Sequence, residues 1–207
     1  MEHLINKAAV LLEALPYIQK FNGATFVVKY GGSFMDSPDE SVRQGVARDV
    51  VFLEAVEINP VVVHGGGKAI SRAMKAEGLL PRFEQGHRVT DEKAVQLVHE
   101  VLSHQINPEI VKTINALGGV ARGFSGTEIF KCHRKLVDGP DGDKIDIGYV
   151  GEVVEVNTKP LLECIANGVT PVISPTAIGE DGHIHNCNAD IAAAVTATSL
   201  KAKRLVF

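Results

Sequence analysis

Residues 25–30 read TFVVKY and run directly into the glycine pair Gly31-Gly32. Residues 60–64 read PVVVH and run directly into a glycine triplet at positions 65–67. Both stretches are short, apolar and rich in β-branched residues, which is typical of strands buried on both faces. The chain between them has helical spacing, and strand–helix–strand crossovers are almost always right-handed. The sequence therefore predicts two neighbouring parallel strands that both end in glycine turns.

Apolar spacing and capping residues predict further helices and strands on both sides of this unit. The expected helices cover residues 3–20, about 38–58 with Asp36 or Ser37 as the cap, about 68–77, 90–118 with Thr90 as the cap and an interruption at Pro108, 158–167, and 189–200. Strands are expected at residues 120–124, 170–174 and 204–207, and a small hairpin or a loop at residues 82–89. Hairpins are expected at 128–137 with 147–156 and around Asp181-Gly182. The sum predicts an α/β fold, a three-layer αβα sandwich with a mostly parallel sheet and a small antiparallel attachment.

The composition argues against several classes of function. The chain has 207 residues, of which 45% are hydrophobic and 22% are charged, with a net charge of -4 and no basic run, so a nucleic-acid surface is not expected. No apolar run approaches the length of a membrane span, and no basic leader precedes the first helix. Cys132, Cys164 and Cys187 fit neither a disulfide framework nor a metal site. Reduced thiols and a cytoplasmic location are therefore expected.

The two glycine turns indicate an anion site at one edge of the sheet. Ligands of open parallel sheets bind beyond the carboxyl ends of the strands, where glycines expose N–H groups and helix N-termini add positive charge. Either turn alone is equally compatible with a tight connection that binds nothing. Lys29 lies near the end of the first strand and is suited to neutralising a transferring phosphoryl group. A lysine that reaches a nearby surface is the alternative.

Two later segments carry further candidate binding residues. Arg88 lies in GHRVTD, and its planar guanidinium suits a carboxylate clamp, although a surface arginine is the default alternative. Asn186 and Asn188 lie in NCNAD and are compatible with amide recognition, and Asp190 in the same segment is compatible with orienting a lysine. On spacing alone, helix capping by Asn188 or Asp190 is favoured.

The sequence does not match two other catalytic motifs, the P-loop of nucleotide-binding proteins and the active site of esterases. No Walker A loop occurs, so a P-loop nucleotide site is not expected. The segment His64–Lys68 reads HGGGK and is similar to the oxyanion loop of esterases, but the segment Gly123–Gly126 lacks the spacing of a nucleophile elbow. The hydrolase hypothesis therefore ranks low.

Four motifs together resemble the acetylglutamate kinases of the amino acid kinase superfamily. They are KYGG at 29–32, HGGG at 64–67, GHRVTD at 86–91 and NCNAD at 186–190, in the order in which that family has them. The resemblance extends from about Thr25 to Phe207. The first two motifs are shared across the superfamily, whereas the last two are much more specific to acetylglutamate kinases.

The resemblance implies an in-line transfer of the ATP γ-phosphoryl group to the side-chain carboxylate of N-acetyl-L-glutamate, a step of arginine biosynthesis. For the phosphoryl group, the resemblance implies that Lys29 stabilises its charge, that Gly32 and Gly66 donate backbone N–H groups to it, and that Asp190 orients the lysines. For the nucleotide, it implies contacts from Gly31 and Gly32. For acetylglutamate, it implies binding by Gly66, Gly67, Arg88, Asn186 and Asn188. ATP with Mg²⁺ is the implied cosubstrate. No resident metal site is expected.

The resemblance also implies a domain organisation. Residues 1–22 resemble the additional N-terminal helix of arginine-inhibited members, which links dimers into a hexamer. Residues 23–207 resemble the substrate-binding part of the kinase domain, so a chain truncated before the ATP-binding half and its second catalytic lysine is expected. Arginine as an allosteric inhibitor, a homo-oligomer (dimer or hexamer) and a PII signalling protein are the candidate partners.

Two alternatives remain beside this interpretation. The chain could act as another superfamily kinase, on glutamate, aspartate, carbamate or a nucleotide, although GHRVTD and NCNAD argue against that. It could also be a non-catalytic module that binds acetylglutamate without turnover.

Overall fold

The centre of the molecule is a parallel five-stranded sheet. The computed structural model describes residues 2–31, 37, 39–139 and 142–207. The strands are β11 (Arg204–Val206), β1 (Thr25–Tyr30), β2 (Asn59–His64), β8 (Thr170–Ile173) and β5 (Ala121–Phe124), in that spatial order. Every neighbouring pair is parallel, and Tyr30 is in register with His64. The ends of β1 and β2 therefore lie side by side, as the two apolar runs predict.

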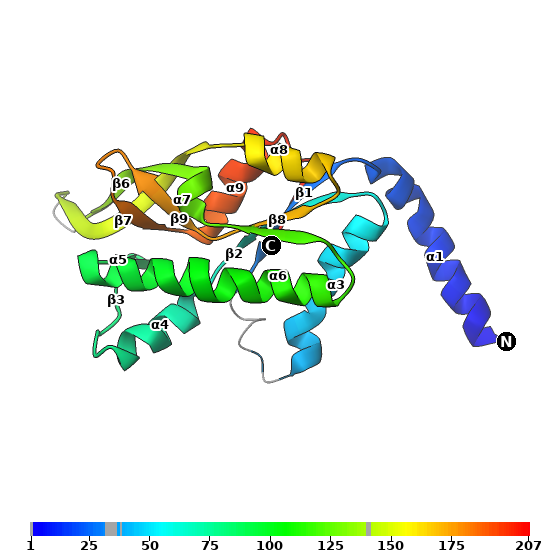
Figure 1. Ribbon diagram of the computed structural model, residues 1–207, viewed down its shortest axis with the longest axis horizontal. Helices are drawn as coiled ribbons and strands as arrows, with labels where there is room; N and C mark the ends of the chain where they lie inside the picture. Colours follow the sequence, from blue (N-terminus) through cyan, green and yellow to red (C-terminus); the bar gives the residue numbers. More distant parts are fainter. Residues whose placement is uncertain (1, 32–36, 38, 140–141) are drawn as a thin grey trace.

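Helices cover both faces of this sheet (Figure 1). One face carries α3 (Glu40–Ala55), α4 (Gly67–Ala76), α5 (Glu92–His99), the π-helical segment η1 (Glu100–Ile106) and α6 (Asn107–Ala116). The other face carries α8 (Lys159–Ala166) and α9 (Ala189–Ser199). Val61 and Val63 of β2 pack with α8 and α9, whereas Val62 packs with α3 to α6. This alternation follows from the pleat of the strand and produces the predicted three-layer sandwich.

A small closed barrel is attached to the sheet. Its strands are β6 (Phe130–Asp138), β7 (Lys144–Val156), β9 (Thr176–Gly179) and β10 (Ile184–Cys187), joined in the order β10-β7-β6-β9. The predicted antiparallel pairs β6–β7 and β9–β10 are confirmed. Two parallel contacts that the sequence did not indicate, β7–β10 and β6–β9, close the barrel.

Two short elements and one long helix complete the fold. The hairpin β3 (Arg82–Glu84) and β4 (His87–Val89) confirms the prediction for residues 82–89, and α7 (Gly126–Ile129) occupies the start of the segment expected as a strand. The helix α1 (Glu2–Phe21) projects away from the body (Figure 1). It exposes a group of large apolar side chains: Val10, Leu11, Leu12, Leu15 and Tyr17.

Two predicted helix caps are wrong by a few residues. Asp39, rather than Ser37, caps α3 by accepting a hydrogen bond from the Ser41 N–H, and Asp36 lies outside the described residues. Asp91, rather than Thr90, caps α5. Thr90 is fully buried, and its backbone pairs with β7 at Ile147 and Tyr149, so it ends the hairpin instead of starting the helix.

Candidate active site

A cleft of about 320 Å³ opens where β1 and β2 end. The start of α4, the β3–β4 hairpin and the junction of β10 with α9 form its other sides. The cleft brings together seven of the residues predicted from the sequence: Lys29, Gly66, Gly67, Arg88, Asn186, Asn188 and Asp190. Gly31 is buried directly after β1, and Gly32 lies outside the described residues. Residues from four distant parts of the chain therefore meet at one sheet edge.

An ion pair joins the first strand to the last helix within this cleft. The Nζ atom of Lys29 lies 2.9 Å from the Oδ1 atom of Asp190. The Lys29 side chain is 23% exposed, whereas that of Asp190 is 51% exposed, so the ammonium is the more enclosed partner. The carboxylate holds the lysine in place, while the open side of the ammonium faces the cleft.

The second glycine turn brings a helix N-terminus to the same place. Gly66 is the N-cap residue of α4, and no side chain caps that end. The free N–H groups of the first turn carry a partial positive charge that favours an anion. A Cβ atom at Gly66 would lie 2.6 Å from Ile106 Cδ1 and 2.6 Å from Leu102 Cδ2. A larger residue at position 66 would therefore force the ends of Leu102 and Ile106, or the turn itself, to move.

Arg88 is a buried cation that lacks an acidic partner within the described part of the chain. Only 7% of the residue is exposed. Its guanidinium donates to the Gly67 carbonyl oxygen at 3.0 Å and to Ser71 Oγ at 2.8 Å, and it stacks on the Phe83 ring at 4.7 Å. Burial lowers the pKa of Arg88 from its usual value. A buried guanidinium with neutral partners is stabilised when a carboxylate ligand binds beside it.

The two asparagines of the NCNAD segment differ in their contacts. Asn188 caps α9, because its Oδ1 atom accepts hydrogen bonds from the N–H groups of Asp190 at 2.7 Å and Ile191 at 3.1 Å. The capping alternative raised by the sequence is therefore confirmed for Asn188. Asn186 lies on β10 and is half-buried at the cleft.

His64, for which the sequence predicted no role, makes a hydrogen bond to the backbone of the second glycine turn. The ring is fully buried, and burial lowers its pKa to about 4. Its Nδ1 atom lies 3.0 Å from the Gly65 carbonyl oxygen, and its Nε2 atom lies 3.2 Å from Asn107 Nδ2. Because Asn107 Nδ2 is a donor, the neutral ring accepts at Nε2 and donates from Nδ1 to Gly65. The position of this histidine directly before the three glycines is the sequence feature that could have indicated its role.

The structure gives Ser125 the role of a helix cap. Its hydroxyl accepts from the Thr127 N–H, and Glu128 completes a capping box at the start of α7. Ser125 is absent from the described lining of the cleft. The serine that the esterase hypothesis would use as its nucleophile, Ser125, therefore does not lie in the cleft at the HGGG turn.

Two kinds of feature are absent from the described residues. They contain no group of three or more histidine, cysteine or acidic side chains arranged to hold a metal ion. Among the same residues, no helix combines the length and the apolar character needed to cross a bilayer.

Comparison with known proteins identifies the class. Residues 24–207 match the amino acid kinase family. The fold is similar to that of an isopentenyl phosphate kinase, with a TM-score of 0.60 at 13% identity over 87% of this chain and 70% of that one. It is also similar to N-acetylglutamate synthase from Neisseria gonorrhoeae solved with coenzyme A and N-acetyl-glutamate, with a TM-score of 0.74 at 25% identity over 96% of this chain and 44% of that one. The chain is therefore a phosphotransferase chain of the amino acid kinase family.

Within that family, the sequence is similar to those of acetylglutamate kinases. The enzyme of Geobacter metallireducens is 45% identical over all of this chain and 72% of its own length. The enzyme of Caldanaerobacter subterraneus subsp. tengcongensis is 47% identical over 98% of this chain and 66% of its own length. The chain belongs to the acetylglutamate kinases, and it spans about two thirds of the length of these relatives.

Proposed function

We propose that the cleft binds N-acetyl-L-glutamate and holds its side-chain carboxylate for attack on the γ-phosphoryl group of ATP. The observation that carries this proposal is the buried guanidinium of Arg88, which shares one cleft with the Lys29–Asp190 ion pair and the N-terminus of α4. Three positive elements converge there, and the substrate and the transferring group are both anionic.

Arg88 is assigned to the α-carboxylate of the substrate. Its contacts to Gly67, Ser71 and Phe83 fix the plane of the guanidinium before any ligand arrives. A fixed planar fork loses little entropy when it binds a carboxylate in a bidentate manner. Asn186 is assigned to the acetamido group, because an amide side chain can both donate to and accept from another amide.

Lys29 and the turn at Gly66 are assigned to the transferring phosphoryl group. The lysine supplies a positive charge whose position is fixed by Asp190, and the first turn of α4 supplies N–H donors. The substrate carboxylate is already ionised at pH 7, so the protein has no nucleophile to activate. Catalysis then consists of positioning and charge neutralisation.

ATP with Mg²⁺ is the proposed cosubstrate. Membership of a kinase family supports a nucleotide donor. Gly31 and Gly32 remain assigned to the nucleotide by the KYGG resemblance alone. An arginine-biosynthetic role, a cytoplasmic location and binding of a PII signalling protein are parts of the same proposal.

A homo-oligomer is proposed to form through α1. The exposed apolar side chains between Val10 and Tyr17 lie on a helix that projects from the body (Figure 1). Such a surface is unfavourable in water unless another chain covers it. Arginine is the proposed allosteric ligand, and the related N-acetylglutamate synthase of Neisseria gonorrhoeae was solved with L-arginine.

The reaction is tested by trapping its product. The full-length protein is incubated with MgATP and acetylglutamate, and the acyl phosphate is captured as a hydroxamate with hydroxylamine. Product with acetylglutamate and little product with glutamate supports the proposal. A better yield with glutamate contradicts the substrate. Binding of acetylglutamate without any hydroxamate favours the non-catalytic module instead.

A further inference from the structure

Two buried thiols meet in the interior of the small barrel. Cys132 lies on β6 and Cys187 on β10, which are opposite strands of the closed order β10-β7-β6-β9. Cys132 is fully buried and Cys187 is 6% exposed, and both belong to one apolar cluster. Both are free thiols. Opposite strands of so narrow a barrel can bring inward-facing side chains into contact.

A glycine on the intervening strand makes this contact close. Gly151 of β7 is directly paired with Cys187. A Cβ atom placed on Gly151 would lie only 2.5 Å from the Cys132 sulfur. The Cys132 sulfur therefore lies against the residue that is directly paired with Cys187. Any larger residue at position 151 would press against the Cys132 side chain.

The two sulfur atoms differ in acidity because they interact. Contact with the Cys187 side chain lowers the pKa of Cys132, and contact with Cys132, together with burial, raises the pKa of Cys187 well above its usual value. Burial and the negative charges of Asp181 and Glu180 raise the pKa of Cys132, but they do not cancel its lowering by Cys187. Cys132 is therefore the more acidic thiol of the pair and Cys187 the less acidic one, which suits an attacking and a resolving thiol.

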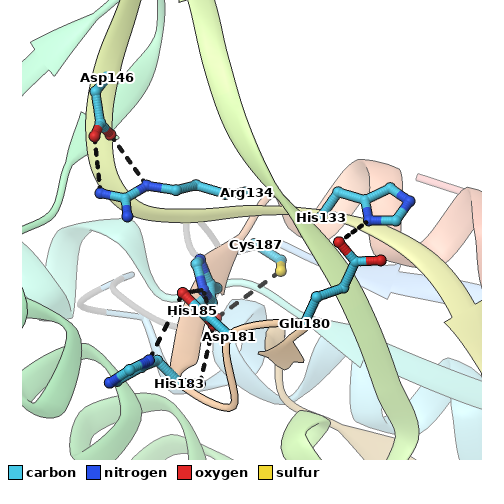
Figure 2. A network of polar contacts seen from close by, with 8 residues as sticks. All are labelled: His133, Arg134, Asp146, Glu180, Asp181, His183, His185 and Cys187. Carbon is cyan, nitrogen blue, oxygen red and sulfur yellow. Dashed lines mark hydrogen bonds and ion pairs between the residues drawn. The ribbon is translucent and has the colours of Figure 1, made fainter.

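Cys187 also connects the barrel to the substrate cleft. It lines that cleft between Asn186 and Asn188. Figure 2 shows Cys187 beside His185, whose ring is held by Asp181 at 3.1 Å on the barrel side. Cys187 lines the cleft and is 6% exposed, so hydrogen peroxide should approach the pair from that side, which a bound substrate would cover.

We infer that Cys132 and Cys187 form an oxidisable dithiol at the edge of the substrate cleft, which hydrogen peroxide converts into a disulfide. The Cys132 thiolate attacks one peroxide oxygen, which gives a sulfenic acid and a hydroxide that takes up the Cys132 proton. The Cys187 sulfur then displaces hydroxide from the sulfenic sulfur, and the Cys187 proton converts it into water. Two thiols and one peroxide give one disulfide and two waters.

The disulfide should weaken substrate binding, a consequence that rests on the proposed function. A bond to Cys132 draws Cys187 towards the barrel interior. Asn186 and Asn188 flank Cys187 in the chain, and Asn188 caps the helix that carries Asp190. Oxidation should therefore lower the affinity for acetylglutamate by roughly tenfold or more, and reduction should restore it.

Cys164 provides the matched control. It is a free, buried cysteine on α8, which is not one of the barrel strands, and burial raises its pKa. Cys164→Ser should form the disulfide as readily as the parent protein, whereas Cys132→Ser and Cys187→Ser should not form it.

The experiment is peptide mapping after exposure of the reduced protein to hydrogen peroxide, with and without acetylglutamate. A linked Cys132–Cys187 peptide, lighter by two hydrogen atoms and formed more slowly with acetylglutamate, supports the inference. Unmodified thiols, separate sulfinic acids or a bond to Cys164 would overturn it. Calorimetry of the reduced protein tests the proposed substrate independently, so a failure to bind acetylglutamate leaves the mapping result interpretable.

Discussion

Asp190 Oδ1 lies 2.9 Å from Lys29 Nζ, and this ion pair connects the first strand of the sheet to the N-terminal turn of α9. The contact depends on Asn188, which starts α9 at the correct place by capping it. The position of the ammonium in the cleft is therefore set by a helix that lies far along the chain from β1.

Asp190→Asn should lower kcat by roughly tenfold or more and change KM for acetylglutamate little, because the lysine loses the charge that positions it. Steady-state kinetics at saturating ATP measures both constants. Glu155→Gln is the control, since it removes an exposed ion pair with Lys131 that lies outside the cleft. An equal loss in both variants would contradict a positioning role for Asp190.

His64→Gln should remove part of the dependence of stability on pH. The buried ring has a pKa of about 4, below its ordinary value of 6.5. The unfolded chain therefore binds a proton more readily, so the contribution of the neutral ring to stability is complete above pH 6.5 and is lost as the pH falls towards 4. The lowering of the His64 pKa corresponds to a contribution of about 3 kcal/mol to the free energy of unfolding.

Urea unfolding of the parent protein and of His64→Gln at about pH 5 and pH 7 measures this effect. The parent protein should lose more stability than the variant between the two pH values. Parallel losses in the two proteins would show that His64 is not the group responsible.

Gly66→Ala should lower the activity of the site, because the added methyl group disturbs the packing of the glycine turn against η1. The added carbon would lie 2.6 Å from the ends of Leu102 and Ile106, so the turn or those side chains must move. We expect a lower kcat/KM for acetylglutamate, by roughly tenfold or more. Gly45→Ala in α3 is the control, because its Cβ atom meets nothing within 4 Å and the helix should gain about 0.5–1 kcal/mol. Full activity of Gly66→Ala would contradict the close-packing argument.

Leu11→Glu combined with Leu15→Glu should reduce the size of the oligomer without unfolding the subunit. Both side chains are exposed on α1, at 68% and 44%, so charges there cost the monomer little but oppose burial against a second chain. Sedimentation velocity measures the size. Lys7→Glu, on the same helix but outside the exposed apolar group, is the control. An unchanged oligomer would mean that α1 does not mediate assembly.

The central sheet and most of the site were predictable because their signals are local. Two β-branched runs ending in glycine turns predict adjacent strand ends, and Lys29 and Gly66 are placed by that rule alone. Arg88 and Asn186 were assigned from the family resemblance. Their meeting in one cleft depends on the packing of a hairpin and a barrel strand that the sequence does not place.

The barrel and the helix caps could not be predicted because they depend on distant partners. The pairing of β7 with β10 joins segments that have no mutual signal in the sequence. Thr90 is an acceptable cap by residue type, but its backbone pairs with β7, which leaves Asp91 to cap α5. The support of Gly65 by His64 likewise depends on Asn107, which comes from the start of α6.

The most direct test of the account is the binding of acetylglutamate to Arg88→Ala, measured by calorimetry against the parent protein. Loss of a buried, charge-assisted clamp should weaken binding by roughly a hundredfold, which corresponds to about 2.7 kcal/mol. Arg134→Ala, which removes an exposed ion pair with Asp146, should bind like the parent protein. Equal affinity of Arg88→Ala and the parent protein would contradict the assignment of this cleft to the substrate.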